Sequence, residues 1–166
     1  INSNRKARGK NMFYTIFFVL LLVTAAWCAW RISVADWRRR IIPDAYLFPM
    51  MLIGLTIINF FPWPIDIADA IIAAIFGYVL TTVIGLIFSM RNKHHNKSDI
   101  PIGMGDIKLI SVGGLWLGTT GLAVALALAC IAGLLWGGTR KQKYIPFAPF
   151  FIGGGILSLI IIWFLI

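Results

Sequence analysis

The chain has 166 residues, of which 60% are hydrophobic and only 13% are charged, and its formal net charge is +9. A mean hydropathy of +0.88 excludes an ordinary soluble protein, and the length suits a single domain. We therefore expect an all-α, polytopic membrane protein that lies in a lipid bilayer. We attribute its positive charge to membrane topology and not to nucleic-acid binding.

Apolar runs predict about six transmembrane helices, each near the ~20 residues that a bilayer requires. In chain order they cover residues 12–32, 45–61, 66–90, 100–118, 119–137 and 145–166. Residues 1–11 form a basic tail, and Met12 stands where a native start would be sensible. We expect this tail not to belong to the native chain, and residues 12–166 to form one transmembrane domain.

Lys and Arg are distributed unevenly among the predicted loops. They follow the first, third and fifth spans, whereas the turns at residues 61–65 and 118–121 carry none. Because cytoplasmic loops are enriched in Lys and Arg, we expect the three basic loops to lie in the cytoplasm. The basic residues before Met12 do not fit this topology, because it places them on the outer side of the membrane. Either the predicted sidedness of the loops is wrong or the tail is atypical, and we favour the second explanation.

All six acidic residues are Asp, and two of them stand at the cytoplasmic ends of predicted spans. Asp36 follows the first span, and Asp106 ends the segment Gly103-Met104-Gly105-Asp106 at the beginning of the fourth. Ionisable groups at the edge of a span are costly and are therefore functional candidates. Two carboxyl groups brought together hold a proton, so the pair can activate water and protonate a leaving group.

The sequence does not establish that Asp36 and Asp106, 70 positions apart, actually meet. Asp36 could instead pair with the neighbouring arginines, and Asp106 could pair with Lys108 or cap a helix start. Asp44 is most simply interpreted as a cap at the beginning of the second span. Asp66 and Asp69 open the third span on the opposite side, where acids suit the positive end of a helix.

Three segments resemble the prepilin peptidases, the membrane aspartic proteases that process type IV prepilins and type II secretion pseudopilins. They are Asp36 with Pro43 and Asp44, which resembles the first catalytic motif; residues 103–109 with 113–118, which resemble the GxGD segment; and residues 145–150, IPFAPF, which resemble the final-span IPFGPF. Ala148 stands where the family usually has Gly, and we expect only a small effect on helix approach.

The resemblance implies that Asp36 and Asp106 are the catalytic pair and that Gly103 and Gly105 shape the backbone beside Asp106. Lys108 either biases the local potential or is a snorkelling base. The implied activity is that of a membrane aspartic endopeptidase of the bacterial inner membrane. It would cleave the leader peptide of a prepilin or pseudopilin at the cytoplasmic face, using water activated by two aspartates, without a metal or an organic cofactor.

Bifunctional members of that family also carry a cytoplasmic region with cysteine pairs, which is associated with N-methylation. The 166 residues contain neither the region nor the pairs, so we expect cleavage without methyltransferase activity. Cys28 and Cys130 lie inside predicted spans, where each behaves as a small apolar side chain. His94 and His95 lie in a polar loop and are interpreted as solvated and not as metal ligands.

The alternative function is that of a non-enzymatic membrane carrier or assembly scaffold whose acids bind a proton or a cation. A carrier usually places its acids near the middle of the membrane and often shows repeated halves. This sequence displays neither feature. It leaves open which prepilin would be the substrate and what the oligomeric state is.

Overall fold

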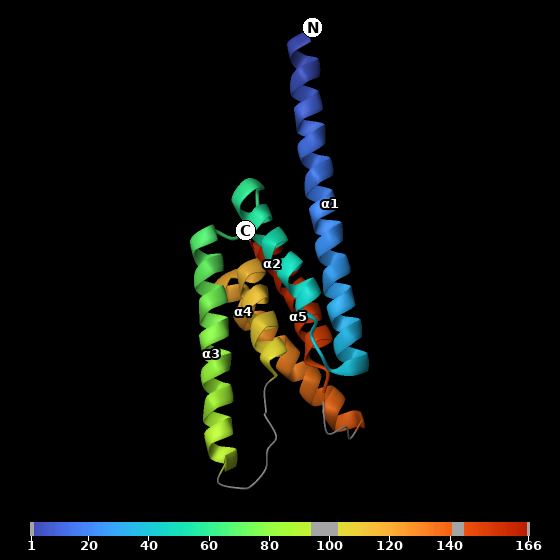
Figure 1. Cartoon of the computed structure of the whole chain (residues 1–166). Helices are drawn as coiled ribbons and strands as arrows, with labels where there is room; N and C mark the ends of the chain where they lie inside the picture. The colour runs from blue at the N-terminus through green and yellow to red at the C-terminus, as the bar shows by residue number, and fades with distance from the viewer. Residues whose placement is uncertain (1, 94–102, 141–144, 166) are drawn as a thin grey trace.

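The computed structural model describes residues 2–93, 103–140 and 145–165, which are helical apart from short connections (Figure 1). The helices are α1 (Asn2–Arg39), α2 (Asp44–Phe60), α3 (Ile67–Lys93), α4 (Met104–Arg140) and α5 (Phe147–Leu165). Four of these are long and apolar enough to cross a membrane, and the fifth, α2, has 17 residues. The predicted all-α class is confirmed, but among the described residues four helices reach spanning length where six spans were predicted.

The helix boundaries differ from the predicted spans at both ends of α1. The helix begins at Asn2, so it includes almost all of the predicted tail, and it continues to Arg39, beyond the predicted end at Ile32. Asp36 therefore lies within the last turns of α1 and not in a loop after it. The predicted start of the fourth span at Ile100 lies outside the described residues.

Helix α4 consists of two helical halves that meet at Gly118, where φ is 67° and ψ is −177°. This conformation is essentially restricted to glycine. In the half before Gly118, a Cβ placed on Gly113 would meet the Phe151 ring, and a Cβ placed on Gly155 would meet Leu117. Residue numbers rise together in both pairs, so the first half of α4 runs parallel to α5.

The half after Gly118 runs in the opposite direction. A Cβ on Gly121 would come within 3.1 Å of the Ser158 hydroxyl, and one on Gly154 within 2.8 Å of the Ala125 carbonyl oxygen. Here the numbers rise on one helix as they fall on the other, so the second half is antiparallel to α5. The chain therefore turns back at Gly118, and Figure 1 shows the second half of α4 descending beside α5.

Small residues bring α3 close to the first half of α4. A Cβ on Gly114 would lie 2.6 Å from the Ala73 carbonyl oxygen, and one on Gly77 would lie 3.1 Å from Ile110. Between helices in a bilayer, where lipid is as apolar as leucine, such close backbone approach is a main source of packing energy. The first half of α4 is thus held firmly against α3, and its beginning is placed at the end of the bundle opposite Gly118.

Candidate active site

Three helix ends meet at one end of the bundle, the lower end in Figure 1. They are the end of α1, which carries Asp36; the beginning of α4, which carries Asp106; and the beginning of α5, which carries Ala148. Because the first half of α4 runs parallel to α5, both helices begin toward this end of the bundle. Because α1 ends there, its last turns reach the same place.

Asp36 is only 6% exposed, which is unusual for a carboxyl group. Its Oδ2 atom accepts a hydrogen bond of 2.8 Å from the backbone N–H of Ala148, 112 positions away in the sequence. Ala148 is the second residue of α5, and the N–H groups of a first helical turn have no acceptor within their own helix. The Asp36 side chain accepts a hydrogen bond from one of these donors. This hydrogen bond partly offsets the free-energy cost of burying the Asp36 carboxyl group.

Asp106 is partly buried and occupies the first turn of α4. Its backbone N–H donates to the Gly103 carbonyl oxygen at 3.0 Å. Its carboxyl group folds back over Gly103, where an added Cβ would lie 3.2 Å from Oδ2. Asp106 therefore lies in the first turn of a helix, where a negative charge suits the positive end of the helix dipole. It also lies close enough to Asp36 for the two negative charges to repel each other.

Gly103 and Gly105 both occupy positions where a side chain would disturb the surroundings of Asp106. A Cβ on Gly103 would crowd the Asp106 carboxyl group, as described above, and a Cβ on Gly105 would lie 2.9 Å from the Cβ of Ile42. Ile42 belongs to the connection between α1 and α2. Gly105 therefore allows this connection, which follows Asp36 closely, to pack directly against the turn that carries Asp106.

Lys108 contacts Asp44 and not Asp106. Its Nζ atom lies 2.6 Å from Asp44 Oδ2, and the two side chains are 44% and 65% exposed. Residues two apart on a helix face different directions, which explains why Lys108 does not reach Asp106. The interpretation of Asp44 as a helix cap is wrong, because α2 is capped by Pro43 without a side-chain hydrogen bond.

The contribution of Ala148 was not anticipated from the sequence. The resemblance drew attention to residues 145–150, but the group that touches Asp36 is a backbone N–H, and a backbone donor leaves no signature in a residue pattern. His94 and His95 lie outside the described residues. Within the described part of the chain, no three His, Cys, Asp or Glu side chains gather as a metal site would require.

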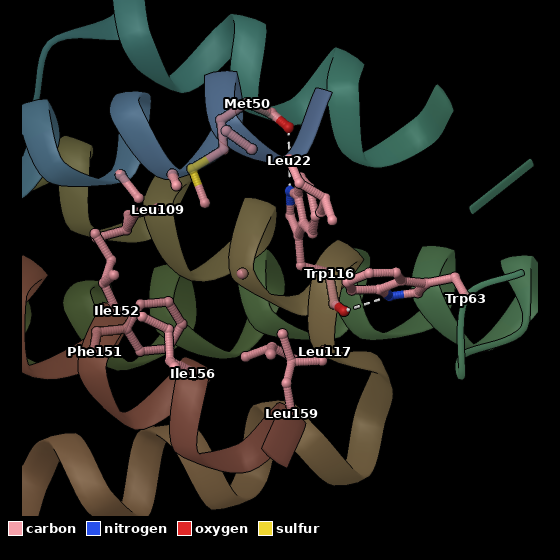
Figure 2. Close-up of a pocket in the computed structure, with 15 residues that line it drawn as sticks. Leu22, Met50, Trp63, Leu109, Trp116, Leu117, Phe151, Ile152, Ile156 and Leu159 are labelled. Atoms are coloured by element: carbon pink, nitrogen blue, oxygen red, sulfur yellow. Dashed lines mark hydrogen bonds between the residues drawn. The ribbon is translucent and has the colours of Figure 1, made fainter. Parts of the chain in front are cut away.

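An apolar cavity of about 210 Å³ lies between α1, α2, α4 and α5 (Figure 2). It is lined by Leu22, Ala25, Ala26, Ala29, Met50, Trp63, Leu109, Gly113, Trp116, Leu117, Phe151, Ile152, Gly155, Ile156 and Leu159. The two indole N–H groups are occupied within the protein: Trp116 donates to the Met50 carbonyl oxygen and Trp63 to the Trp116 carbonyl oxygen, each at 3.1 Å. The cavity wall is therefore almost purely apolar.

The cavity follows the same helix faces as the polar groups at the end of the bundle. Leu109 comes three residues after Asp106, and Ala29 comes seven residues before Asp36, spacings that place side chains on one face of a helix. At 1.5 Å per residue, its nearest lining residues on α1 and α4 begin roughly 5 to 10 Å from the acids along the helix axes. The cavity and the acids thus lie on the same faces of α1 and α4, separated by about one to two helical turns.

The sequence model of the type IV leader peptidase family matches residues 16–138, a stretch that contains both Asp36 and Asp106. No solved structure matches the chain.

Curated relatives cover most of this chain. The prepilin leader peptidase/N-methyltransferase of Pseudomonas putida is 26% identical over 148 residues, which are 85% of this chain and 49% of that protein. The protein of the same name from Burkholderia pseudomallei (strain 1026b) is 30% identical over 134 residues, 76% of this chain and 41% of that protein. That of Aeromonas salmonicida (strain A449) is 26% identical over 147 residues, with coverages of 84% and 48%. The chain therefore spans about half the length of the curated relatives it matches.

Proposed function

The chain belongs to the type IV leader peptidase family, and on that premise we propose that it is a membrane aspartic endopeptidase. Its substrate is a type IV prepilin or a type II secretion pseudopilin, from which it removes the leader peptide. The observation that carries this proposal is that Asp36 and Asp106 lie at the same end of the bundle, close enough for the charge of Asp36 to act on Asp106. These are the two residues that match the family's catalytic pair.

The chemistry requires one ionised and one protonated carboxyl group. The ionised group removes a proton from a water molecule, whose oxygen attacks the carbonyl carbon of the scissile peptide, while the protonated group gives its proton to the carbonyl oxygen. As the C–N bond breaks, the first group passes its new proton to the departing amine. A hydroxyl of the tetrahedral intermediate then returns a proton to the second group. The scheme needs no metal and no organic cofactor.

The apolar cavity provides a place for the apolar segment of the substrate. Family substrates carry a short leader before an apolar helix, and the cavity lies on the same faces of α1 and α4 as the acids, beginning three residues from Asp106 and seven residues from Asp36. Its lining residues span about two helical turns on each of α1, α4 and α5. Over that length, one face of a substrate helix presents a row of about three side chains. We propose that such a row enters this cavity while the scissile bond lies over the acids.

We place the protein in the bacterial inner membrane with the acids on the cytoplasmic side. Supporting this orientation, α1 and α3 and the second half of α4 all end in basic residues: Arg38 and Arg39, Arg91 and Lys93, and Arg140. Counting the two halves of α4 separately gives six apolar segments of alternating direction, as in the predicted six-span topology. Residues 12–166 then form one peptidase domain.

The test is a cleavage assay in membranes that contain the protein and a purified prepilin, with the shortened product detected by mass spectrometry. Asp36→Asn and Asp106→Asn are each expected to lower the rate by about a hundredfold or more, because each removes a proton carrier. Asp66→Asn, an exposed acid at the opposite end of the bundle, is the matched control and is expected to cut like the parent.

Parent-like cleavage by both Asn variants of the pair would contradict the proposal. If the parent protein yields no shortened product from any prepilin offered, the result favours a carrier or a scaffold over a peptidase. The same mass spectra test the expectation of cleavage alone, which predicts that the new amino terminus of the product remains unmethylated when a methyl donor is present.

A further inference from the structure

Asp36 and Asp106 have different surroundings, although both stand at helix ends. Asp36 is 6% exposed, and its Oδ2 atom is held by a donor from another helix, the Ala148 N–H. Asp106 is partly buried and folds back over Gly103 in the first turn of its own helix. The two acids are therefore not equivalent holders of a shared proton.

Burial disfavours the ionised form of Asp36, and its contacts oppose this effect by favouring the charge. An N–H donor stabilises a carboxylate more than a neutral carboxyl group, and the first turn of α5 also presents the positive end of the helix dipole. Arg40, one turn after Asp36, adds a favourable charge. The other charge that acts near Asp36 is that of Asp106 from α4, which is negative. Helix α5 contributes no titratable side chain over Phe147–Leu165.

We infer that the first turn of α5 positions Asp36 as the ionised base of the reaction and leaves the shared proton on Asp106. The inference rests on the proposed function, and it assigns the role of the base to Asp36 and the role of the acid to Asp106. With Oδ2 held by the Ala148 N–H, the Oδ1 atom of Asp36 takes the proton from water, and Asp106 protonates the carbonyl oxygen of the substrate. Asp36 then protonates the amine as the C–N bond breaks, and the intermediate returns a proton to Asp106. Ala148 is a positioning residue that acts through its backbone.

The sharpest test removes this N–H and nothing else. Incorporation of lactic acid in place of Ala148 turns the amide between Phe147 and residue 148 into an ester, which keeps the methyl group and deletes the donor. Because a hydrogen bond to a charged group contributes about 1.5 to 3 kcal/mol, kcat is expected to fall about tenfold to a hundredfold. KM is expected to change little, since the Ala148 N–H is already donated to Asp36.

The pH profile separates this positioning role from a merely structural one. Without the donor, Asp36 loses part of the stabilisation of its charge, so the acid limb of the kcat profile moves to higher pH. Glycolic acid in place of Gly153 is the matched control, because it introduces an ester about one turn later in α5, at an N–H that bonds within the helix and at a position that does not line the cavity. That control leaves the acid limb where the parent has it.

A second comparison does not depend on the folding of the ester variant. An amide imitates a neutral carboxyl group, so Asp106→Asn is expected to retain at least about tenfold more residual cleavage than Asp36→Asn. The reverse order, or an ester variant with parent kcat and an unmoved acid limb, would overturn the division of roles while leaving the proposed function intact. Failure of the parent to cut any prepilin would instead overturn the proposed function itself.

Discussion

The Asp69 carboxyl group of α3 holds Thr119 of α4 by two kinds of hydrogen bond. It accepts one from the Thr119 hydroxyl at 2.7 Å and others from the Thr119 backbone N–H at 3.1 and 3.3 Å. Thr119 directly follows Gly118, the residue at which α4 turns back. A carboxyl group from one helix thereby satisfies the first amide of the next helical segment, and the reversal is anchored to α3.

Replacing Asp69 with Ala is expected to lower the free energy of unfolding by about 1 to 2 kcal/mol, because the Thr119 donors lose their partner. The measurement is the midpoint of thermal unfolding in detergent micelles. Asp66→Asn is the matched control, since the Asp66 carboxyl group accepts one long bond of 3.4 Å, from the Ala68 N–H, which an amide oxygen can also accept. Equal losses in the two variants would show that the Asp69 contact does not anchor the reversal.

Gly118→Ala is expected to destabilise the protein by about 3 kcal/mol or more. The backbone conformation itself costs a side chain about 1 to 3 kcal/mol, and the added methyl group would collide with the Asp69 carboxyl group. Gly138→Ala is the control, because nothing lies within 4 Å of the place where its Cβ would stand. It is expected to stabilise the helix by about 0.5 to 1 kcal/mol. The comparison uses the same thermal unfolding measurement.

Breaking the ion pair between Lys108 and Asp44 is expected to have little effect on stability. Both side chains are substantially exposed, at 44% and 65%, and such pairs contribute about 0 to 1 kcal/mol. Lys108→Ala and Asp44→Asn are therefore expected to unfold within about 1 kcal/mol of the parent and to retain kcat within about threefold. A larger loss of kcat in Lys108→Ala alone would assign this lysine a part in the reaction.

The cleavage rate is expected to fall at both extremes of pH. At low pH both carboxyl groups are protonated and neither can accept a proton from water, whereas at high pH the shared proton is lost and neither can donate. The two apparent constants belong to the pair and not to either residue. Steady-state cleavage measured across the pH range gives the profile, and a flat profile would exclude a shared proton.

Filling the apolar cavity is expected to weaken substrate binding. Ala29→Phe places a ring in the cavity, so KM for a prepilin is expected to rise about tenfold, a change equivalent to ~1.4 kcal/mol. Val23→Phe is the control, because Val23 is 60% exposed on the same helix and does not line the cavity. An unchanged KM in Ala29→Phe would show that the substrate helix binds elsewhere.

Local features of this protein followed from the sequence because they depend on residues close together in the chain. Apolar runs predicted a helical membrane protein, and the predicted boundary between residues 118 and 119 coincides with the reversal of α4. Gly103, Gly105 and Asp106 were recognisable as a unit because they lie within four consecutive residues.

Contacts across long separations were decided only by the tertiary structure. The sequence left open whether Asp36 and Asp106 meet, misjudged Asp44 as a cap, and gave no indication that Lys108 contacts Asp44, 64 positions away. Such pairings depend on how closely the helices pack, which is set at positions such as Gly114 and Gly105 by the absence of a side chain.

Residue types alone therefore determined that this chain is a helical membrane protein with acids at span ends, because hydropathy and charge are properties of single side chains. The fold decided what those acids touch. The first turn of α5 reaches Asp36 through a backbone N–H, a group that every residue except proline possesses, and only its position in space makes the Ala148 amide special.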